Sequence, residues 1–422
     1  MSDTVRDYQV IIVGAGFAGV AAAQRLAKER IRTLLIDRNN YQQFQPLLYQ
    51  VATAQLAAND VAAPLRSLFR KHPSVRVLTA EVSSIDARDR SVTLPDGTVF
   101  RSDVLVISAG AEVNYFGTPG ADEFSYPLYS VDDATALASS LVEQLDRADT
   151  AAATHGDCEP IDVVVVGGGP TGVETAGAIG ETIERVLPHY FHDAVPRRCT
   201  VHLVDHGDTV LKPFSEKLQR YTRRSLERLG VVMLMGTGVS EVRADGVTLS
   251  DGSTLPAHVV VWAGGLKARS VVASAGLETG RGGRVDVDAD LTAPGVPGVY
   301  VLGDAANIPD GSGGTLPQLG SVAMQSGKWA GRNIVADLTG GQRRPFGYVD
   351  KGFMAMIGRM SAVAEVGPKR IELTGPLAFA SWLAVHAALL PQARARIGAL
   401  ASWPRDYLSR SRSQFVVGNR PR

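Results

Sequence analysis

The chain repeats one local pattern twice: a buried strand, a glycine-rich turn, an alanine-containing helix and a second strand. The first copy runs from Val10 to Asp37, and the second from Ile161 to Asp205. A run of four β-branched residues precedes each turn, which is typical of strands covered on both faces of a parallel sheet. The duplication therefore predicts an α/β protein with two Rossmann-like domains.

The first turn has the spacing of a dinucleotide-binding fingerprint. Gly14, Gly16 and Gly19 follow a strand and open a helix, and Asp37 ends the next strand. Glycines there permit the turn, the approach of a pyrophosphate and close helix–strand packing, while the acid accepts hydrogen bonds from a ribose. A chance glycine-rich turn is the alternative, but strand, helix and acid all lie where a nucleotide site requires them.

The second turn repeats this spacing with Gly167, Gly169 and Gly172, and its strand-end acid is Asp205. A carboxylate at that position repels the 2′-phosphate of NADPH, so the sequence predicts that this domain binds NADH. The nearest basic residues, Arg197 and Arg198, precede the strand and so do not contradict this preference.

Other strands also end in small residues, where the chain can pass close to a nucleotide. Three glycines at such strand ends are further candidates for contact with a cofactor: Gly110, Gly264 and Gly303. Asp304 follows Gly303 and could reach a ligand hydroxyl, or could serve a turn or a helix cap. Glu174, in the first turn of the second fingerprint helix, is either a helix-dipole acid or a carboxylate that faces the reacting rings.

Composition excludes several classes of protein. The counts of Lys+Arg and of Asp+Glu are both 43, which gives no reason to expect a nucleic-acid partner. The two cysteines, Cys158 and Cys199, form no paired motif, so we expect neither a disulfide framework nor a metal site, and a reducing cytosol fits. No signal peptide is expected at the N-terminus.

The C-terminal region combines apolar and basic residues. Leu377 to Leu390 is an apolar run between two prolines, and a helix of that length, about 21 Å, is too short to span a bilayer. Phe379, Trp382, Leu383 and Leu390 are spaced for one helical face. Seven arginines and one acid, Asp406, follow Pro376. We expect peripheral attachment to the cytoplasmic face of the cell membrane; packing on the protein's own core or a homodimer interface is the alternative.

The expected domains follow from these motifs. Residues 1–114 and 286–345 form a first, discontinuous dinucleotide-binding domain. Residues 115–285 form a second domain, which binds NADH, and residues 346–422 form a region of amphipathic membrane-associating helices. The Ala/Thr/Asp-rich stretch from Arg147 to Pro160 is expected to be a linker or loop.

Four stretches of the chain carry a family resemblance: Tyr41–Gln50, Gly167–Glu174, Lys351–Gly358 and the region from Trp382 to Tyr407. Together they resemble the type II NADH dehydrogenases, which are single-subunit, non-proton-pumping NADH:quinone oxidoreductases. The resemblance covers essentially the whole chain.

The resemblance implies that FAD and NADH are the cofactors, and that the discontinuous domain of residues 1–114 and 286–345 is the FAD domain. FAD would be bound by Gly14, Gly16, Gly19, Asp37 and Asp304, and NADH by Gly167, Gly169, Gly172, Glu174 and Asp205. Hydride would pass from NADH to the flavin, and electrons on to a quinone, menaquinone or ubiquinone, in respiration or in a biosynthetic oxidation.

The quinone site implied by the resemblance lies beside an Ala-Gln-x-x-x-Gln motif. Here the second glutamine is Gln325, but Ser321 replaces the first, and a serine hydroxyl has a shorter reach. The identity of the acceptor is therefore open. Glu174, Gln325 and Lys351 are the candidates for controlling protonation near the acceptor.

Related flavoproteins fit less well. A disulfide reductase or a sulfide:quinone oxidoreductase needs redox cysteines, and residues 38–60 contain none. A soluble ferredoxin or rubredoxin reductase, or a specialised biosynthetic reductase, shares the two fingerprints but leaves the basic, apolar C-terminal region unexplained. A signalling flavoprotein that dimerises also shares the fold.

Overall fold

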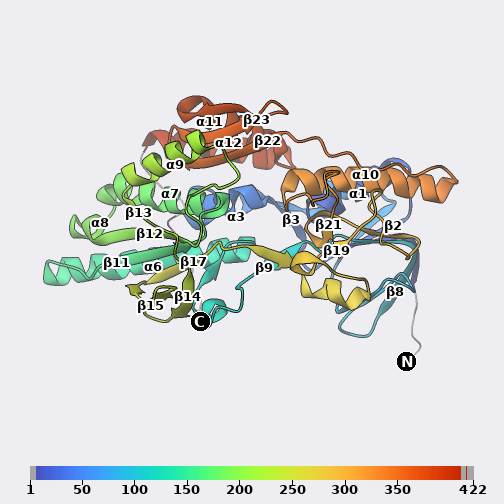
Figure 1. The fold of residues 1–422 in the computed structure, drawn as a ribbon, viewed down its shortest axis with the longest axis horizontal. Coiled ribbons are helices and arrows are strands. Elements are labelled where there is room, and N and C mark those ends of the chain that lie inside the picture. Colours follow the sequence, from blue (N-terminus) through green and yellow to red (C-terminus); the bar gives the residue numbers. More distant parts are fainter. Residues whose placement is uncertain (1–5, 410–414, 416–422) are drawn as a thin grey trace. The chain divides into compact units, whose positions relative to one another are not determined.

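The computed structural model describes residues 6–409 and residue 415 (Figure 1). The chain forms two compact units, each assembled from separate stretches of sequence. Unit 1 contains residues 1–43, 63–112 and 266–349. Unit 2 contains residues 44–62, 113–265 and 350–422.

These units differ from the expected three-part division. Residues 266–285, expected in the NADH domain, belong to unit 1. The separate region expected at 346–422 is divided, since residues 346–349 belong to unit 1 and the residues described from 350 onward belong to unit 2. The assignment of a particular cofactor to each domain stays a prediction.

A seven-stranded sheet forms the centre of unit 1. Its parallel strands follow the order β5-β2-β1-β8, β20 pairs with the end of β8, and β7 and β6 continue the sheet in antiparallel fashion. The strands are β1 (Arg6–Val13), β2 (Thr33–Asp37), β5 (Val75–Thr79), β6 (Ser84–Asp86), β7 (Ser91–Thr93), β8 (Val99–Ile107) and β20 (Val299–Val301).

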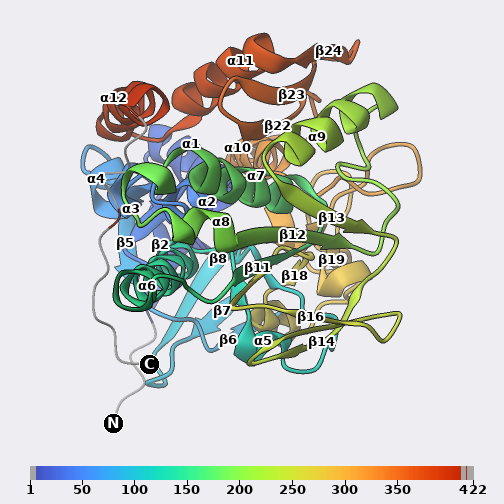
Figure 2. The ribbon, with the colours of Figure 1, turned by 90° about the vertical axis from the view of Figure 1, so that its left-hand side faces the viewer.

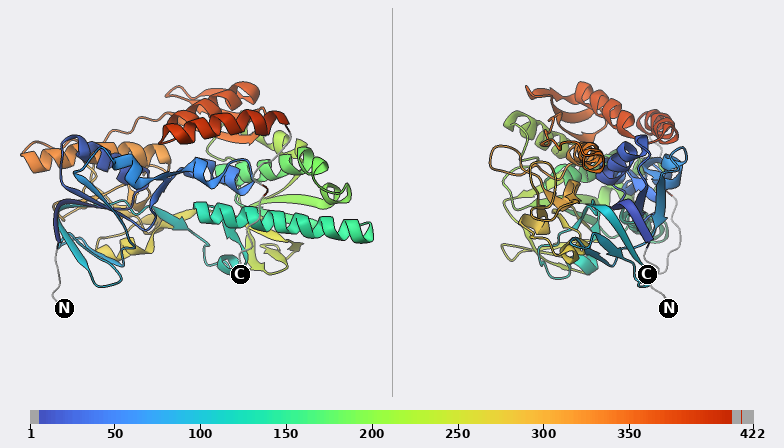
Figure 3. Two further views of the ribbon diagram at one scale, coloured as in Figure 1. Left: turned by 180° about the vertical axis from the view of Figure 1, so that it is seen from behind. Right: turned by 90° about the vertical axis from the view of Figure 1, so that its right-hand side faces the viewer.

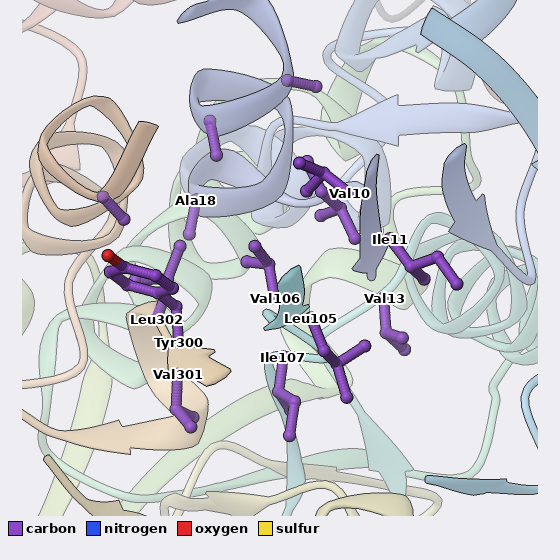
Figure 4. Packing of buried hydrophobic residues seen from close by; sticks show 14 of the residues in the cluster. Val10, Ile11, Val13, Ala18, Leu105, Val106, Ile107, Tyr300, Val301 and Leu302 are labelled. Atoms are coloured by element: carbon purple, nitrogen blue, oxygen red, sulfur yellow. The ribbon is translucent and has the colours of Figure 1, made fainter. Parts of the chain in front are cut away.

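The core of unit 1 comes from apolar runs on adjacent strands. Val10, Ile11, Leu105 and Ile107 are completely buried. Figure 4 shows Leu105 and Ile107 of β8 between the β1 residues and Tyr300 of β20. Continuous rather than alternating burial is expected for parallel strands that are covered on both faces. These strands hold the first glycine turn at one edge of a rigid sheet.

Helices α1 (Phe17–Lys28) and α10 (Gly320–Thr339) pack on each other through small residues. A Cβ atom at Gly327 would collide with the backbone carbonyl of Ala18. The Tyr300 hydroxyl donates a 2.6 Å hydrogen bond to Asp337, which fixes α10 against β20. The close packing therefore sets the position of the first fingerprint helix.

Unit 1 also contains the short elements α4 (Leu65–Phe69), β18 (Leu266–Ala268), β19 (Val285–Asp286) and β21 (Ala306–Asn307). Three further short strands lie at the ends of the stretches that build the two units: β3 (Tyr41–Gln43), β4 (Ala62–Pro64) and β9 (Ala111–Val113).

Unit 2 has a five-stranded parallel sheet in the order β10-β17-β11-β12-β13. The second fingerprint helix, α7 (Pro170–Arg185), packs against β12, and α9 (Glu216–Arg228) packs against β13 (Figure 2). The strands are β10 (Tyr126–Pro127), β11 (Ile161–Val166), β12 (Cys199–Asp205), β13 (Val231–Met235) and β17 (Val259–Trp262).

Smaller elements complete this part of unit 2. They are the helices α2 (Leu48–Ala52), α3 (Ala58–Val61), α5 (Ala121–Phe124) and α8 (Ala194–Arg198), and the antiparallel strands β14 (Val239–Arg243), β15 (Gly246–Leu249) and β16 (Thr254–Pro256).

The expected linker from Arg147 to Pro160 is wrong over most of its length. Helix α6 (Val131–His155) continues through the stretch as far as His155 (Figure 3). Gly156, whose φ is 82°, follows the helix and terminates it. The buried side chains of Ala148 and Ala152 lie on the inner face of this part of the helix. Burial of that face outweighs the weak helix propensity of the Thr and Asp residues.

Residues 352–409 form strands as well as the expected helices. A three-stranded antiparallel sheet precedes two helices, α11 (Gly375–Leu389) and α12 (Ala393–Ser409). None of the helices in the described part of the chain combines the length and hydropathy of a membrane span. The strands are β22 (Gly352–Gly358), β23 (Ser361–Val366) and β24 (Ile371–Thr374).

The face of α11 that was expected to meet the membrane is a core face. Trp382 and Leu390 are completely buried and Phe379 is 7% exposed, while Leu383 is half-buried. Trp382 lies among Tyr49 and other aromatic rings of unit 2. Periodic spacing identifies a buried face, but it does not distinguish a bilayer from the protein's own interior.

Candidate cofactor and acceptor sites

The first glycine turn brings three backbone segments into close contact. Gly14 has a φ of 95°, and a Cβ atom there would collide with the carbonyl oxygen of Ser108 at the end of β8. A Cβ atom at Gly19 would collide with the carbonyl oxygen of Gly14. The Ser108 hydroxyl donates to the carbonyls of Val13 (3.0 Å) and Gly14 (2.9 Å), which ties β8 to the turn.

The space beside Gly16 is open, in contrast to these contacts. No heavy atom lies within 4 Å of the position that its Cβ would take, and no side chain caps the start of α1. The first amide groups of the helix therefore face a site that a phosphate group fits.

Asp37 anchors the turn as well as ending β2. Its carboxylate accepts hydrogen bonds from the backbone amides of Ala15 (2.6 Å) and Asn39 (2.7 Å). Burial raises the pKa of this carboxyl above its usual value, although both amides and the charge on Arg38 lower it. The acid is thus held at the edge of the sheet beside the glycine turn.

Two more predicted positions lie in unit 1 at strand ends. Gly303 has a φ of 62°, follows β20, and lies against Ala18 of α1 and Ala323 of α10. Asp304 is the next residue and lies in a short 3₁₀ helix, Gly303–Ala305. Gly110 has a φ of 74°, and its carbonyl accepts the amide of Arg269 (3.3 Å).

The second turn in unit 2 repeats the first. Gly167 has a φ of 113°, and a Cβ atom there would lie 2.5 Å from the carbonyl oxygen of Ala263. A Cβ atom at Gly172 would collide with the carbonyl of Gly167, and the space beside Gly169 is open. Gly264 follows Ala263 and lies against the Trp262 ring.

Asp205 also repeats the contacts of Asp37. It accepts hydrogen bonds from the amides of Gly168 (2.5 Å) and Gly207 (2.6 Å). In both units the strand-end acid binds the middle amide of the Gly-x-Gly turn and the amide two residues after itself. Sequence reasoning assigned these acids to ribose hydroxyls, and it missed this structural role because spacing alone does not show the direction of a side chain.

Among the described site residues, Glu174 is an acid whose side chain is almost completely buried. It is 9% exposed, and its Oε1 accepts a 3.1 Å hydrogen bond from the backbone amide of Met356 in β22. Burial raises the pKa of its carboxyl to about 8, although the Met356 amide and the Trp382 indole lower it. A carboxyl that changes its charge near neutral pH is suited to holding and releasing a proton.

A second glutamate on the same face of α7 was not predicted. Glu181 is 4% exposed, and its Oε2 accepts the amide of Arg359 (2.8 Å). Between the two acids, Gly177 lets α7 approach so closely that a Cβ there would collide with the Ile357 carbonyl. The spacing of seven residues on one helix face was the signal that could have identified this pair.

The other two predicted acceptor residues have different surroundings. Gln325 in unit 1 donates to the Val349 carbonyl and accepts from the Val349 amide, each at 3.0 Å. Ser321, one turn earlier, is 2.9 Å from the Tyr348 hydroxyl. Lys351 is exposed in unit 2. The hydrogen bond to Glu174 comes from a different residue of this stretch, the backbone amide of Met356.

Comparisons with known proteins agree with this arrangement. The family model for pyridine nucleotide-disulphide oxidoreductases matches residues 8–327. Two type II NADH:quinone oxidoreductases of Mycobacterium tuberculosis are similar: one is 35% identical over 98% of this chain and 90% of its own length, and the other is 36% identical over 97% and 89%.

A solved structure has the same fold. The NDH2 protein of Plasmodium falciparum, solved in complex with NADH, has a TM-score of 0.87 and 18% sequence identity, and the match covers 97% of this chain and 100% of that one.

The pKa of Glu174 predicts a pH-dependent stability. Between pH 4.5 and 8 the folded protein keeps a proton that the unfolded chain loses, so each pH unit destabilises the fold by about 1.4 kcal/mol. Glu174→Gln should therefore raise the midpoint of thermal unfolding relative to wild type by an amount that grows from pH 5 to pH 8 and then stays constant.

The control is Glu184→Gln, which changes an exposed acid near the end of the same helix. A difference between Glu174→Gln and wild type that is the same at every pH would show that Glu174 is ionised throughout this range.

Proposed function

Because the chain belongs to the pyridine nucleotide-disulphide oxidoreductase family, and within it to the type II NADH:quinone oxidoreductases, we propose that it oxidises NADH with bound FAD and reduces a quinone. The observation that carries this proposal is the pair of equivalent glycine turns, one in each unit, with open space beside Gly16 and Gly169. Two dinucleotide sites suit a reaction that uses two nucleotide cofactors.

The residues of unit 1 fit FAD. The open space at Gly16 and the uncapped start of α1 suit a pyrophosphate. Asp37, which is held beside the same turn, would accept a hydrogen bond from a ribose hydroxyl. Asp304 follows the strand beside α1 and suits the ribityl chain. When bound, FAD supplies the ring that accepts a hydride from NADH and passes electrons to the quinone.

The residues of unit 2 have two tasks. Gly167, Gly169 and Gly172 shape the NADH pyrophosphate site, and the Asp205 carboxylate favours NADH over NADPH. Glu174 holds a proton on its carboxyl below about pH 8 and is the candidate donor to a quinone oxygen.

Gln325 and Lys351 are the other residues assigned to the acceptor. In unit 1, Gln325 fixes the backbone of Val349 through both ends of its amide. In unit 2, Lys351 contributes an exposed positive charge. We assign both to positioning and electrostatics, and not to a covalent step.

A different acceptor is the second candidate function, and Ser321 favours it. This hydroxyl is already paired with Tyr348 and stands where the family pattern has a glutamine. A soluble NADH-dependent reductase with another acceptor would keep both glycine turns.

An acceptor screen tests the proposed function. We expect the purified protein to contain one FAD per chain and to oxidise NADH with menaquinone or ubiquinone much faster than with oxygen. Ferricyanide serves as the reference acceptor. A protein that reduces ferricyanide and neither quinone would exclude the quinone reductase and favour the second candidate.

The outer face of α11 and α12 supports attachment to a membrane surface. Leu377 is 71% exposed, Ile397 68% and Leu400 55%. Arg394 and Arg405 are also exposed on α12. Apolar side chains beside arginines suit an anionic membrane surface, and a lipid-soluble quinone would enter from that side. We place this surface at the cytoplasmic face of the cell membrane.

Four arginines that were expected to contribute to this surface lie outside the described residues: Arg410, Arg412, Arg420 and Arg422. The same outer face could instead bind a second copy of the chain. The membrane test below therefore includes a measurement of the molecular mass in solution.

The selectivity for NADH is expected to depend on Asp205. Asp205→Asn removes the charge that repels a 2′-phosphate, so the ratio of kcat/KM for NADH to that for NADPH should fall about fivefold, or roughly 1 kcal/mol. KM for NADH should also rise, because both carboxylate oxygens accept amides and asparagine keeps one acceptor.

Asp37→Asn is the matched control, since Asp37 makes the equivalent contacts in unit 1. In this variant the ratio of kcat/KM for NADH to that for NADPH should equal the wild-type ratio. An unchanged ratio in Asp205→Asn would assign nucleotide selectivity to other residues.

Membrane binding is expected to depend on the outer face of α12. Ile397→Glu and Leu400→Glu should each weaken binding to vesicles rich in phosphatidylglycerol by about tenfold or more, because burial of such a side chain contributes roughly 1.5–3 kcal/mol. NADH:ferricyanide activity should not change, and the measurement is co-sedimentation at several lipid concentrations.

Val232→Glu is the control, because Val232 is an exposed apolar residue of β13. Wild-type protein that never sediments with these vesicles would contradict the membrane proposal. If in addition Ile397→Glu changes the molecular mass in solution, the face is a homodimer interface.

A further inference from the structure

An apolar chamber lies within unit 2, against the second fingerprint helix. The residues that line it all belong to this unit and come mainly from α6, α7, the end of α2 and the starts of β11 and β12. Phe415 closes one side, and the space left inside has a volume of about 40 Å³. Among the described residues of the lining, only Thr53, Thr182 and Cys199 have polar side chains.

The polar side chains of this lining are already hydrogen-bonded. Each of the three donates to the backbone carbonyl four residues earlier in the chain, Thr53 at 2.8 Å, Thr182 at 2.9 Å and Cys199 at 3.2 Å. A water molecule is held in a cavity by about two to four polar partners. The chamber therefore suits an apolar occupant.

One aromatic ring already covers the chamber. Phe415 is half-buried, and its ring meets those of Tyr190 and Phe191 edge to face, with centroids 5.9 and 6.3 Å apart. It also packs against the buried cluster that contains Leu145 and Leu187, both of which line the chamber. Edge-to-face contact between aromatic rings is favourable beyond the burial of their area. Phe415 thus has specific partners on unit 2.

The sequence around Phe415 is typical of a short docking segment. After Ser409 the chain contains arginines, serines and amides, together with one glycine and one proline, and its large apolar residues are Phe415, Val416 and Val417. Transfer of such side chains from water to an apolar surface is favourable. A chamber that Phe415 already lines provides that surface.

We propose that the chain's own C-terminal segment, residues 415–417, occupies this chamber with Phe415 as its anchor. The inference goes beyond the proposed function and does not depend on it. Because Ile179 and Ile183 of α7 line the chamber, the segment covers the second half of the helix that carries Glu174. Residues 415–417 are thereby assigned to the interior of unit 2, and not to the membrane surface proposed for the outer face of α12.

A thiol in the lining reports whether the chamber is covered. Cys199 is half-buried, and burial raises the pKa of its thiol to about 12, so little of the reactive thiolate forms near neutral pH. Removal of the cover would admit water and a reagent, and would lower that pKa. Cys158 is buried in the adjoining cluster and does not line the chamber, so it is an internal reference.

The test measures alkylation of the full, FAD-loaded protein by N-ethylmaleimide, with mass spectrometry to assign each modified cysteine. Phe415→Ser should speed the modification of Cys199 about tenfold or more, because the thiol becomes accessible and ionises more readily. The rate at Cys158 should stay at the wild-type value. Phe415→Leu, which keeps an apolar side chain, should give an intermediate rate at Cys199.

Phe124→Ser is the matched control. Phe124 lies at the end of α5 in the same unit, is 37% exposed and does not line the chamber. In this variant the rate at Cys199 should equal the wild-type rate.

A peptide tests the segment directly. A synthetic peptide of residues 410–422 is added to the Phe415→Ser protein at about 1 mM, which is the order of effective concentration that a short flexible tether provides. It should slow the modification of Cys199 again. The same peptide with serine in place of Phe415 should have no effect.

The outcomes decide between the possible occupants. An unchanged Cys199 rate in Phe415→Ser would overturn the inference. Protection of Cys199 by phosphatidylglycerol vesicles and not by the peptide would also overturn it, and would assign the chamber to a lipid chain. A wild-type rate that falls as the protein concentration rises would overturn the assignment to the same chain, in favour of a second copy.

These measurements need no enzymatic activity, so they decide the inference even if the proposed function fails. If Phe415→Ser does not fold, Phe415→Leu and the Phe124→Ser control still decide the question.

Discussion

The two nucleotide turns depend on a hydrogen bond from a turn amide to a strand-end carboxylate. Asp37 accepts the amide of Ala15, and Asp205 accepts the amide of Gly168. Each bond holds the glycine turn against the sheet, and the collisions expected for any Cβ at Gly14 or Gly167 allow no other residue type there. The space beside Gly16 and Gly169 is free of neighbouring atoms and suits a pyrophosphate.

A second set of contacts makes the C-terminal part of unit 2 integral to that unit. Glu174 accepts a hydrogen bond from a backbone amide of β22, and Glu181 accepts one from the residue that follows β22. Gln50 accepts a hydrogen bond from Trp403 of α12. Each contact satisfies a buried polar group, so losing one partner leaves the other uncompensated. The helices that we assign to the membrane surface therefore belong to the same unit as the acid that we assign to proton transfer.

Sequence reasoning was successful where a local rule decides the structure, and it failed where burial decides. Helix α6 runs through a stretch that looked like a linker, because the buried face of Ala148 and Ala152 outweighs weak helix propensity. Trp382 and Phe379 were expected to face lipid, but they pack inside unit 2. Apolar spacing does not identify what covers a face.

The sequence by itself determined the fold class, the two glycine turns, their strand-end acids and the family, because these depend on short spacings and on a backbone geometry that only glycine permits. Tertiary structure alone decided that Asp37 and Asp205 also anchor their turns, that burial places the pKa of Glu174 near 8, and that Gln50 meets Trp403. Desolvation and side-chain direction arise from residues distant in sequence, so no local pattern encodes them.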